Sequence, residues 1–288
     1  MAKFKIKRQA ASDFTESGLP HNRKEVFFDS IKLHWLTFLK IGCLLLASML
    51  PIFAICIVRD NLIADALNNL SSLEQARYTL LLFDGISIPL YLISAFAFSG
   101  AFRVVRKIAW AEFLFFGEDF KEGIKLNYGL FSKVFLLVGA GIFCVDLTML
   151  FSSMDVMKGI PLGLSLMLLL PIAIIVIVQA TIYNIDFFGA LKNALFLFAK
   201  SVLSSVACSL SVASPMLMLL ISNTVAKHIC LSLYMLIVMP YVCLGVFLAV
   251  CSVLDKHINV YSHPEIVGKG ICIISEVDEE YDEDFSEE

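Results

Sequence analysis

Long apolar runs, separated by short polar gaps, dominate the chain from residue 41 onward. A helix needs about 17 to 25 predominantly apolar residues to cross a bilayer. Six runs have that length, and they cover residues 41–58, 78–101, 134–151, 161–183, 201–222 and 230–254. The pattern therefore predicts an all-α polytopic membrane protein with six transmembrane helices, in a membrane domain over residues 25–257.

A spaced motif, Phe-x3-[Ile/Leu]-Lys-x5-Phe-x-Lys, stands in front of the first, third and fifth runs. On a helix its three apolar positions fall within about 40° of one another, and both lysines fall on the opposite side. Such a segment suits a membrane interface, with apolar side chains toward the acyl chains and lysines among the headgroups. The motif predicts three cytoplasmic amphipathic elbow helices and three repeated units of one elbow and two spans. Convergence is the alternative, because any entry to a span can use a basic amphipathic collar. The copies are Phe27-Ile31-Lys32-Phe38-Lys40, Phe120-Ile124-Lys125-Phe131-Lys133 and Phe187-Leu191-Lys192-Phe198-Lys200.

Composition and charge agree with a membrane location. Hydrophobic residues make up 59% of the 288 and charged residues 17%, against about 25% charged in a soluble domain. The net charge of −4 comes from residues 276–288, which hold nine carboxylates and no base, so the rest of the chain carries +5. We predict a basic cytoplasmic segment over residues 1–24 and a disordered acidic cytoplasmic tail over 258–288. The tail either docks on the basic elbows or only solubilises the chain.

Positive charge is distributed unequally between the two sides that six spans would create. Eighteen of the 22 Lys and Arg residues fall on the side of the two termini, and the other four are Arg59, Arg77, Lys158 and Lys227. The positive-inside rule then places both termini in the cytoplasm of a cell whose plasma membrane holds the protein. The partners predicted for the basic side are anionic lipid headgroups and another membrane protein such as an importer. The candidate interfacial or partner-binding residues are Phe27, Lys32, Lys40, Arg103, Arg106, Lys107, Phe120, Lys125, Lys133, Phe187, Lys192 and Lys200.

Several segments between residues 25 and 200 resemble the YesL-like family of bacterial polytopic membrane proteins, a domain family of unknown function. The resemblance implies a Gram-positive plasma-membrane protein associated with carbohydrate uptake, and it supplies no catalytic residues. The chain departs from the family in its first external loop, 59–77, and in its acidic tail. The similar segments are Lys32-Leu33-His34-Trp35-Leu36, Ser48-Met49-Leu50-Pro51, Phe102-Arg103-Val104-Val105-Arg106-Lys107, Asp119-Phe120 with Lys125, Asn127 and Ser132, residues 171–186, and Lys192-Asn193-Ala194-Leu195.

Two carboxylates, Asp84 and Asp146, lie inside predicted spans. An ionisable group at the centre of a membrane helix costs about 2.5 to 3.5 kcal/mol on insertion scales, so each is a functional candidate. Both fall in the outer half, where Arg59, Arg77 or Lys158 can reach them. The two interpretations are a paired structural role and an ion or proton site.

Enzyme signatures are missing from the sequence. It contains no phosphate-binding Gly-x4-Gly-Lys-[Ser/Thr] loop, no His-Glu-x2-His and no Gly-x-Ser-x-Gly, and its eight cysteines do not have zinc-ligand spacing. We therefore predict a non-enzymatic protein with no cofactor, no metal and no nucleic-acid partner. The favoured function is a membrane accessory or scaffold, and the alternative is a small secondary transporter or channel for a sugar or other solute. A bundle filled by Leu and Phe favours the first, and a polar cavity at the midplane favours the second.

Overall fold

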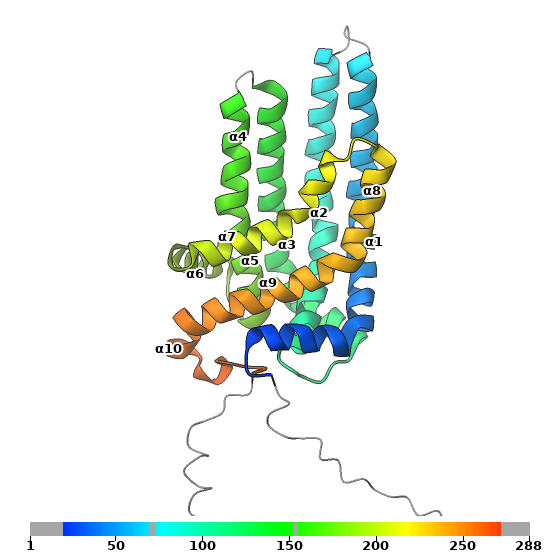
Figure 1. The fold of residues 1–288 in the computed structure, drawn as a ribbon. Helices are drawn as coiled ribbons and strands as arrows, with labels where there is room; N and C mark the ends of the chain where they lie inside the picture. Colours follow the sequence, from blue (N-terminus) through cyan, green and yellow to red (C-terminus); the bar gives the residue numbers. More distant parts are fainter. Residues whose placement is uncertain (1–19, 69–72, 153–154, 272–288) are drawn as a thin grey trace, which may run out of the picture.

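The computed structural model describes residues 20–68, 73–152 and 155–271, and within them it is helical without strands (Figure 1). The all-α prediction is confirmed. Two short π-helical turns, η3 and η5, join helices that continue one another, α4 with α5 and α8 with α9. The elements are α1 Arg23–Asn68, α2 Leu73–Ala109, α3 Phe116–Phe151, α4 Asp155–Leu164, η3 Ser165–Leu169, α5 Leu170–Ile182, α6 Phe187–Lys200, α7 Val202–Ala213, the 3-10 helix η4 Ser214–Leu220, α8 Thr224–Leu233, η5 Tyr234–Val238, α9 Met239–Leu254, η6 Asp255–Asn259, α10 Val260–Ser262 and η7 Pro264–Ile266.

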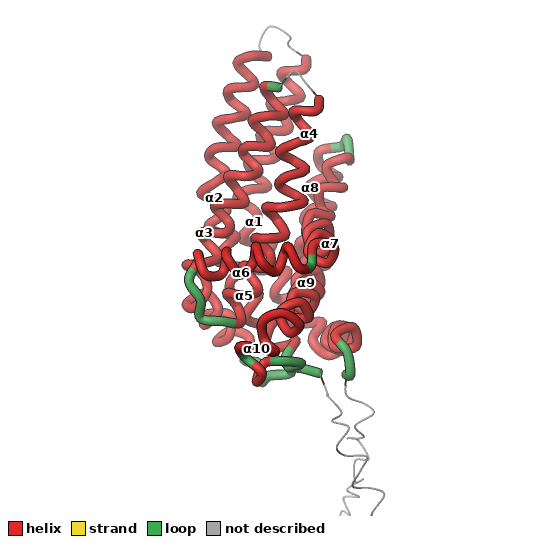
Figure 2. The backbone as a smooth tube through the Cα atoms, turned by 90° about the vertical axis from the view of Figure 1, so that its left-hand side faces the viewer, coloured by secondary structure: helices red, strands yellow, loops and turns green. Residues whose placement is uncertain are grey.

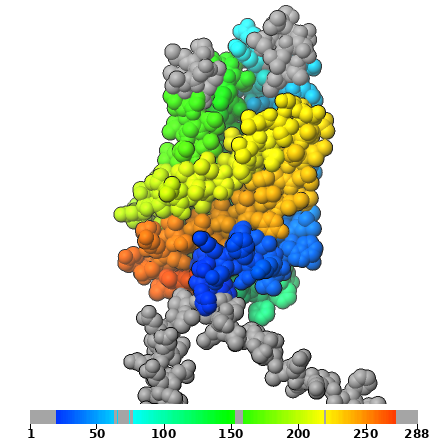
Figure 3. Space-filling model, in the orientation of Figure 1, coloured from blue at the N-terminus to red at the C-terminus, as the bar shows by residue number. Residues whose placement is uncertain are grey.

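The first four long helical segments run up and down beside one another, whereas α7 and α9 cross them obliquely (Figure 1). Seen from the side in Figure 2, α7 and α9 are viewed almost end-on against the upright bundle. In the space-filling view of Figure 3 they form two diagonal bands above the first turns of α1. Both described ends of the chain lie at the same end of the bundle, which we call the termini end, and the opposite end is the far end.

Five helical segments are long and apolar enough to cross a membrane. They are Arg23–Leu62, Arg77–Ala109, Phe116–Phe151, Gly159–Ile182 and Thr224–Ser262. A sixth exists only if α6 and the segment after it, which bend by 110° at Ser201, are counted as one span. The predicted run 201–222 thus differs from the other five. Ser201 breaks the helix with φ −139° and ψ 45°, and Pro215, which cannot donate a backbone hydrogen bond, lies at the start of the 3-10 helix η4.

The three motif copies lie on three different backbones. α1 leaves helical geometry at His34, in the middle of the first copy. The second copy lies in the first half of α3, a single 36-residue helix, and the third lies on the separate helix α6. A common elbow unit is therefore not repeated, since no separate helix precedes the span in the second copy.

The face pattern of the motif is nevertheless the same in each copy. The apolar positions are buried or half-buried, and six lysines are exposed: Lys32, Lys40, Lys125, Lys133, Lys192 and Lys200. Phe38 and Phe131 belong to the core, and Phe27, Phe120 and Phe187 pack against it. Phe38 and Phe131 thus face protein, and contact of the half-buried positions with lipid acyl chains stays a prediction.

The core is densest where α9 meets α1, α2 and α5. Leu244, Phe247 and Leu254 of α9 have no exposed surface. α1 reaches this region through a glycine, since a Cβ atom on Gly42 would lie 1.8 Å from the Leu236 carbonyl oxygen. Only glycine permits so close a backbone approach.

The predicted disordered tail does not begin at residue 258. Residues 258–271 form the end of η6, then α10, η7 and a turn, and the Gly268 amide donates to Asp255 Oδ2 at 3.4 Å. The acidic residues 276–288 lie outside the described part of the chain.

Candidate functional site: charged clusters at both ends of the bundle

Arg59 of α1 bridges Asp84 and Asp146, the two carboxylates predicted to lie inside spans, at the far end. Its Nη1 donates to Asp84 Oδ1 at 2.9 Å, and its Nη2 donates to Asp146 Oδ1 at 3.3 Å. The Asp84 side chain is 6% exposed and that of Asp146 17%. Of the three expected partners, Arg77 is exposed, and the side chain of Lys158 lies outside the described residues. The arrangement favours the paired structural role, because one guanidinium ties α1, α2 and α3 together.

A second ion pair joins α1 to α8 at the same end. Lys227 Nζ contacts Asp60 Oδ2, and His228 Nε2 lies 4.0 Å from the same oxygen. The Asn223 side chain caps α8 by accepting from the Ala226 amide at 3.0 Å, which fixes the first turn that carries both residues. Sequence reasoning missed this pair, although Asp60 directly follows Arg59 and the distribution of Lys and Arg had predicted Lys227 on the side opposite the termini.

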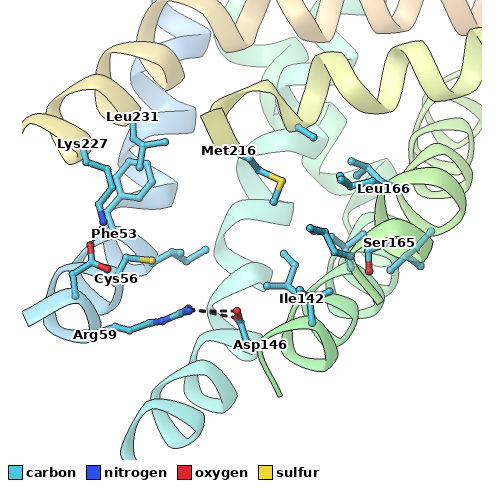
Figure 4. Close-up of a pocket in the computed structure, with 18 of the residues that line it drawn as sticks. Phe53, Cys56, Arg59, Ile142, Asp146, Ser165, Leu166, Met216, Lys227 and Leu231 are labelled. Atoms are coloured by element: carbon cyan, nitrogen blue, oxygen red, sulfur yellow. Dashed lines mark hydrogen bonds and ion pairs between the residues drawn. The ribbon is translucent and has the colours of Figure 1, made fainter. Parts of the chain in front are cut away.

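Residues of both ion pairs line a cavity of about 440 Å³ (Figure 4). Its charged residues are Arg59, Asp60, Asp146 and Lys227. The rest of its lining is mainly apolar and comes chiefly from α1, α3, η3 and α8, with single residues of α4, α5, α7 and η4; it includes Phe53, Cys56, Ile142, Ser165, Leu166, Met216 and Leu231.

A smaller cavity of about 210 Å³ lies in the middle of the bundle, and it is apolar. Met49, Tyr91, Ala173 and Cys243 are among its lining residues, and no described lining residue carries a charge. Toward the termini end it meets a layer of aromatic rings. The ring centroids of Phe98 and Phe135 are 5.3 Å apart, and those of Phe102 and Phe131 are 5.9 Å apart.

The cations at the end of α2 pair with carboxylates in the first two turns of α3. Arg103 Nη2 lies 2.9 Å from Glu122 Oε1, and Lys107 Nζ lies 2.6 Å from Asp119 Oδ1. Asp119 also accepts from the Phe115 amide at 2.7 Å, which closes the turn. These α2 cations, predicted as an interfacial surface, therefore hold the α2–α3 connection.

Trp110 lies between two further cations. Arg106 Cζ is 4.9 Å from its ring centroid and Lys269 Nζ is 4.5 Å from it. Both cations also pair with Glu112, at 3.7 Å and 3.4 Å. Cation–π contacts are favourable at these distances, so Trp110 joins the end of α2 to the last described residues.

Asp255 collects the remaining contacts at the termini end. Arg23 Nη2 lies 2.7 Å from Asp255 Oδ2, and Asn259 Nδ2 donates to Asp255 Oδ1 at 2.7 Å. The Tyr183 hydroxyl donates to Asn259 Oδ1. Burial raises the pKa of the Tyr183 phenol far above its ordinary value, so it remains a donor. This cluster joins α1, η6 and the residue after α5.

Two of the exposed motif lysines reach aromatic rings of the next motif-bearing helix. Lys40 Nζ lies 5.6 Å from the ring centroid of Phe116, the first residue of the helix with the second copy. Lys133 Nζ lies 5.9 Å from the ring centroid of Phe187, the first residue of the third copy. Lys200 lies over the ring of Phe196 on its own helix.

Comparison with protein-family models, curated proteins and solved structures found no match. The YesL-like resemblance therefore stays a prediction. Over residues 20–68, 73–152 and 155–271 no three His, Cys, Asp or Glu side chains are grouped so that they could hold a metal ion.

Proposed function

We propose that the protein is a non-enzymatic accessory or scaffold protein of a bacterial plasma membrane, with its termini end in the cytoplasm. One observation carries the proposal: the described clusters of charged side chains lie toward the two ends of the bundle, and the cavity between the clusters is apolar. A path for a sugar needs polar groups in the middle of the membrane to replace its water. The distribution of Lys and Arg supports the orientation.

A small carrier is the second candidate, and one feature favours it. The far-end cavity and the central cavity share the lining residues Val138 and Leu170, so they follow one another along α3 and α5. Opening of the aromatic layer would then continue this path toward the termini end.

Two native cysteines separate the candidates without a new side chain. Cys56 lines the far-end cavity and Cys243 the central one. We would keep each as the only cysteine and treat sealed, oriented vesicles with a membrane-impermeant thiol reagent from either side. An accessory protein predicts labelling of Cys56 from outside and no labelling of Cys243 from either side. Labelling of Cys243 in the folded protein would favour the carrier, and labelling of both in detergent-denatured protein is the control.

A partner is sought at the exposed turn between α2 and α3. Phe113 there is 91% exposed, which suits an interaction surface or insertion into lipid. Replacement of Phe113 by a photo-crosslinking phenylalanine, followed by isolation from native membranes, should yield one stoichiometric protein adduct. The same label at Tyr78, which is 59% exposed at the far end, is the control. Crosslinking to lipid alone at both positions would argue against a scaffold. Co-purification of a carbohydrate importer would support the sugar association that the resemblance implies.

A further inference from the structure

A third cavity, of about 290 Å³, lies at the termini end between α2, α3 and the end of α5 with the residues that follow it. Two arginines of α2, Arg103 and Arg106, line it together with Asn127 of α3. Thr181 and Asn184 add polar groups on the opposite wall, and the remaining lining is mostly aliphatic. Unlike the central cavity, this one is polar and carries charge of one sign.

Three hydrogen-bond donors of these lining side chains are unused. Arg103 Nε, Arg106 Nε and Asn127 Nδ2 are buried and have no hydrogen-bond partner. Asn127 as a whole is only 5% exposed. Buried donors in folded proteins are nearly always paired, so each unpaired one requires an explanation, such as a ligand or ion. Three such donors belong to residues that line one cavity, which points to an acceptor that these side chains can reach by small rotations, because the atoms themselves have almost no exposed surface in the present arrangement.

The carboxylates near this cavity do not occupy it. Glu122 pairs with Arg103 Nη2 and Glu112 with Arg106 Nη2, so both contact terminal guanidinium nitrogens and leave Nε unpaired. Neither glutamate lines the cavity, where the described charged residues are both arginines. Arg106 Nη1 is fixed by donating to the Thr181 carbonyl at 3.0 Å. Both terminal nitrogens of Arg106 and one of Arg103 are thus engaged, and the Nε atoms, which have almost no exposed surface, become available to a ligand only when these side chains turn.

We propose that this cavity binds a phosphomonoester group, carried either by a small soluble phosphate compound or by a lipid headgroup such as that of phosphatidic acid. Guanidinium groups match phosphate oxygens in geometry and charge. A phosphomonoester offers up to two negative charges to the two arginines, whereas a carboxylate offers one. The volume is at the lower limit for ligand sites, about 300 Å³, which fits a headgroup or a small metabolite. The proposal does not depend on the protein being a scaffold or a carrier.

The test uses the full-length protein purified in a mild detergent, with thermal unfolding as the readout. The soluble probes are sodium phosphate and glycerol 3-phosphate, and the lipid probe is phosphatidic acid in mixed micelles, with phosphatidylcholine as its control. A saturable rise in the unfolding temperature with the soluble probes identifies a free phosphate compound, and a rise with phosphatidic acid alone identifies a headgroup. No rise with any of them, or an equal rise with sodium chloride at the same ionic strength, overturns the proposal.

Variants connect the binding to this cavity. Asn127→Asp keeps the size of the side chain and places a negative charge beside the two guanidinium groups, so the affinity should fall at least tenfold. Arg103→Lys keeps the charge but loses the fork, and it should also weaken binding if Asn127→Asp does not fold. Arg77→Gln removes one positive charge at the far end and should bind as the wild type does. Wild-type affinity in a folded Asn127→Asp or Arg103→Lys variant would contradict the assignment.

Discussion

Replacement of Arg59 by Met should destabilise the protein by about 3 kcal/mol. The substitution keeps much of the aliphatic length but leaves Asp84 and Asp146 in one site without a cation. Loss of one partner of a buried ion pair costs about 3 to 5 kcal/mol, because a charge stays buried and uncompensated. Since the Arg59 side chain is 29% exposed, water screens part of that cost, and we expect the lower limit.

The carboxylates should behave differently from the arginine. Asp146→Asn leaves Arg59 paired with Asp84 at 2.9 Å, and it also removes the repulsion between two like charges. We expect a cost below about 1 kcal/mol. The triple variant Arg59→Met, Asp84→Asn, Asp146→Asn has no charge in the cluster and should regain most of the stability that Arg59→Met loses, because a neutral replacement of a buried ionic group is often tolerated.

Reversible unfolding in mixed micelles of increasing SDS content, followed by tryptophan fluorescence, measures these differences. Arg77→Gln, an exposed arginine at the same end, is the control and should change the unfolding free energy by less than about 0.5 kcal/mol. If Arg59→Met were as stable as the wild type, or if the triple variant were as unstable as Arg59→Met, the cluster would not act as described.

Three further predictions rest on other parts of the structure. Gly42→Ala should destabilise the protein by about 1 to 3 kcal/mol through overpacking against the Leu236 carbonyl. Its control is Gly129→Ala on α3, where no neighbouring atom lies within 4 Å of the new Cβ, and this variant should be neutral or stabilise by up to about 1 kcal/mol. Equal effects of the two substitutions on the unfolding free energy in SDS would contradict this reasoning. Replacement of Lys125, Lys133, Lys192 and Lys200 by Glu should invert or prevent insertion, and unchanged topology in cysteine labelling would show that these lysines do not set the orientation. Arg23→Gln removes the ion pair with Asp255 and the hydrogen bond to the Lys269 carbonyl. Trypsin should therefore cleave after Lys269 faster in this variant than in Lys24→Gln, a control at an exposed residue. Equal cleavage rates would mean that Arg23 does not hold this segment.

The sequence was most informative about features that depend on local composition. Length and hydropathy predicted helices of membrane-spanning length at five of the six runs, and the cost of burying a carboxylate singled out Asp84 and Asp146. The pairing with Arg59 was within reach of sequence reasoning because Arg59 lies near the end of the first apolar run, at a depth comparable to both carboxylates.

Contacts between distant segments were not predictable in the same way. Asp60 and Lys227 belong to helices far apart in the chain. The contacts at the termini end join residues that are farther apart still, and the hydrogen bond between Arg23 and Lys269 spans 246 residues. Hydropathy gives the length of a helix and not its tilt, which depends on packing against neighbours. The oblique course of α7 and α9, and the cavities beside them, therefore had no signal in the sequence.

The position of α9 in the chain has a consequence for biosynthesis. α9 is the core of the segment Thr224–Ser262, and half of the most apolar window of that segment is buried inside the protein, against 11% for α3. Among the described segments long enough to cross a membrane, Thr224–Ser262 is also the last to leave the ribosome. The earlier helices must therefore enter the membrane with the surface that will receive Leu244, Phe247 and Leu254 still covered by lipid or by the insertion machinery. Assembly of the bundle is in this sense post-translational: lipid has to leave that surface before the core can close, and a chain interrupted before Thr224 would lack the helix that displaces it.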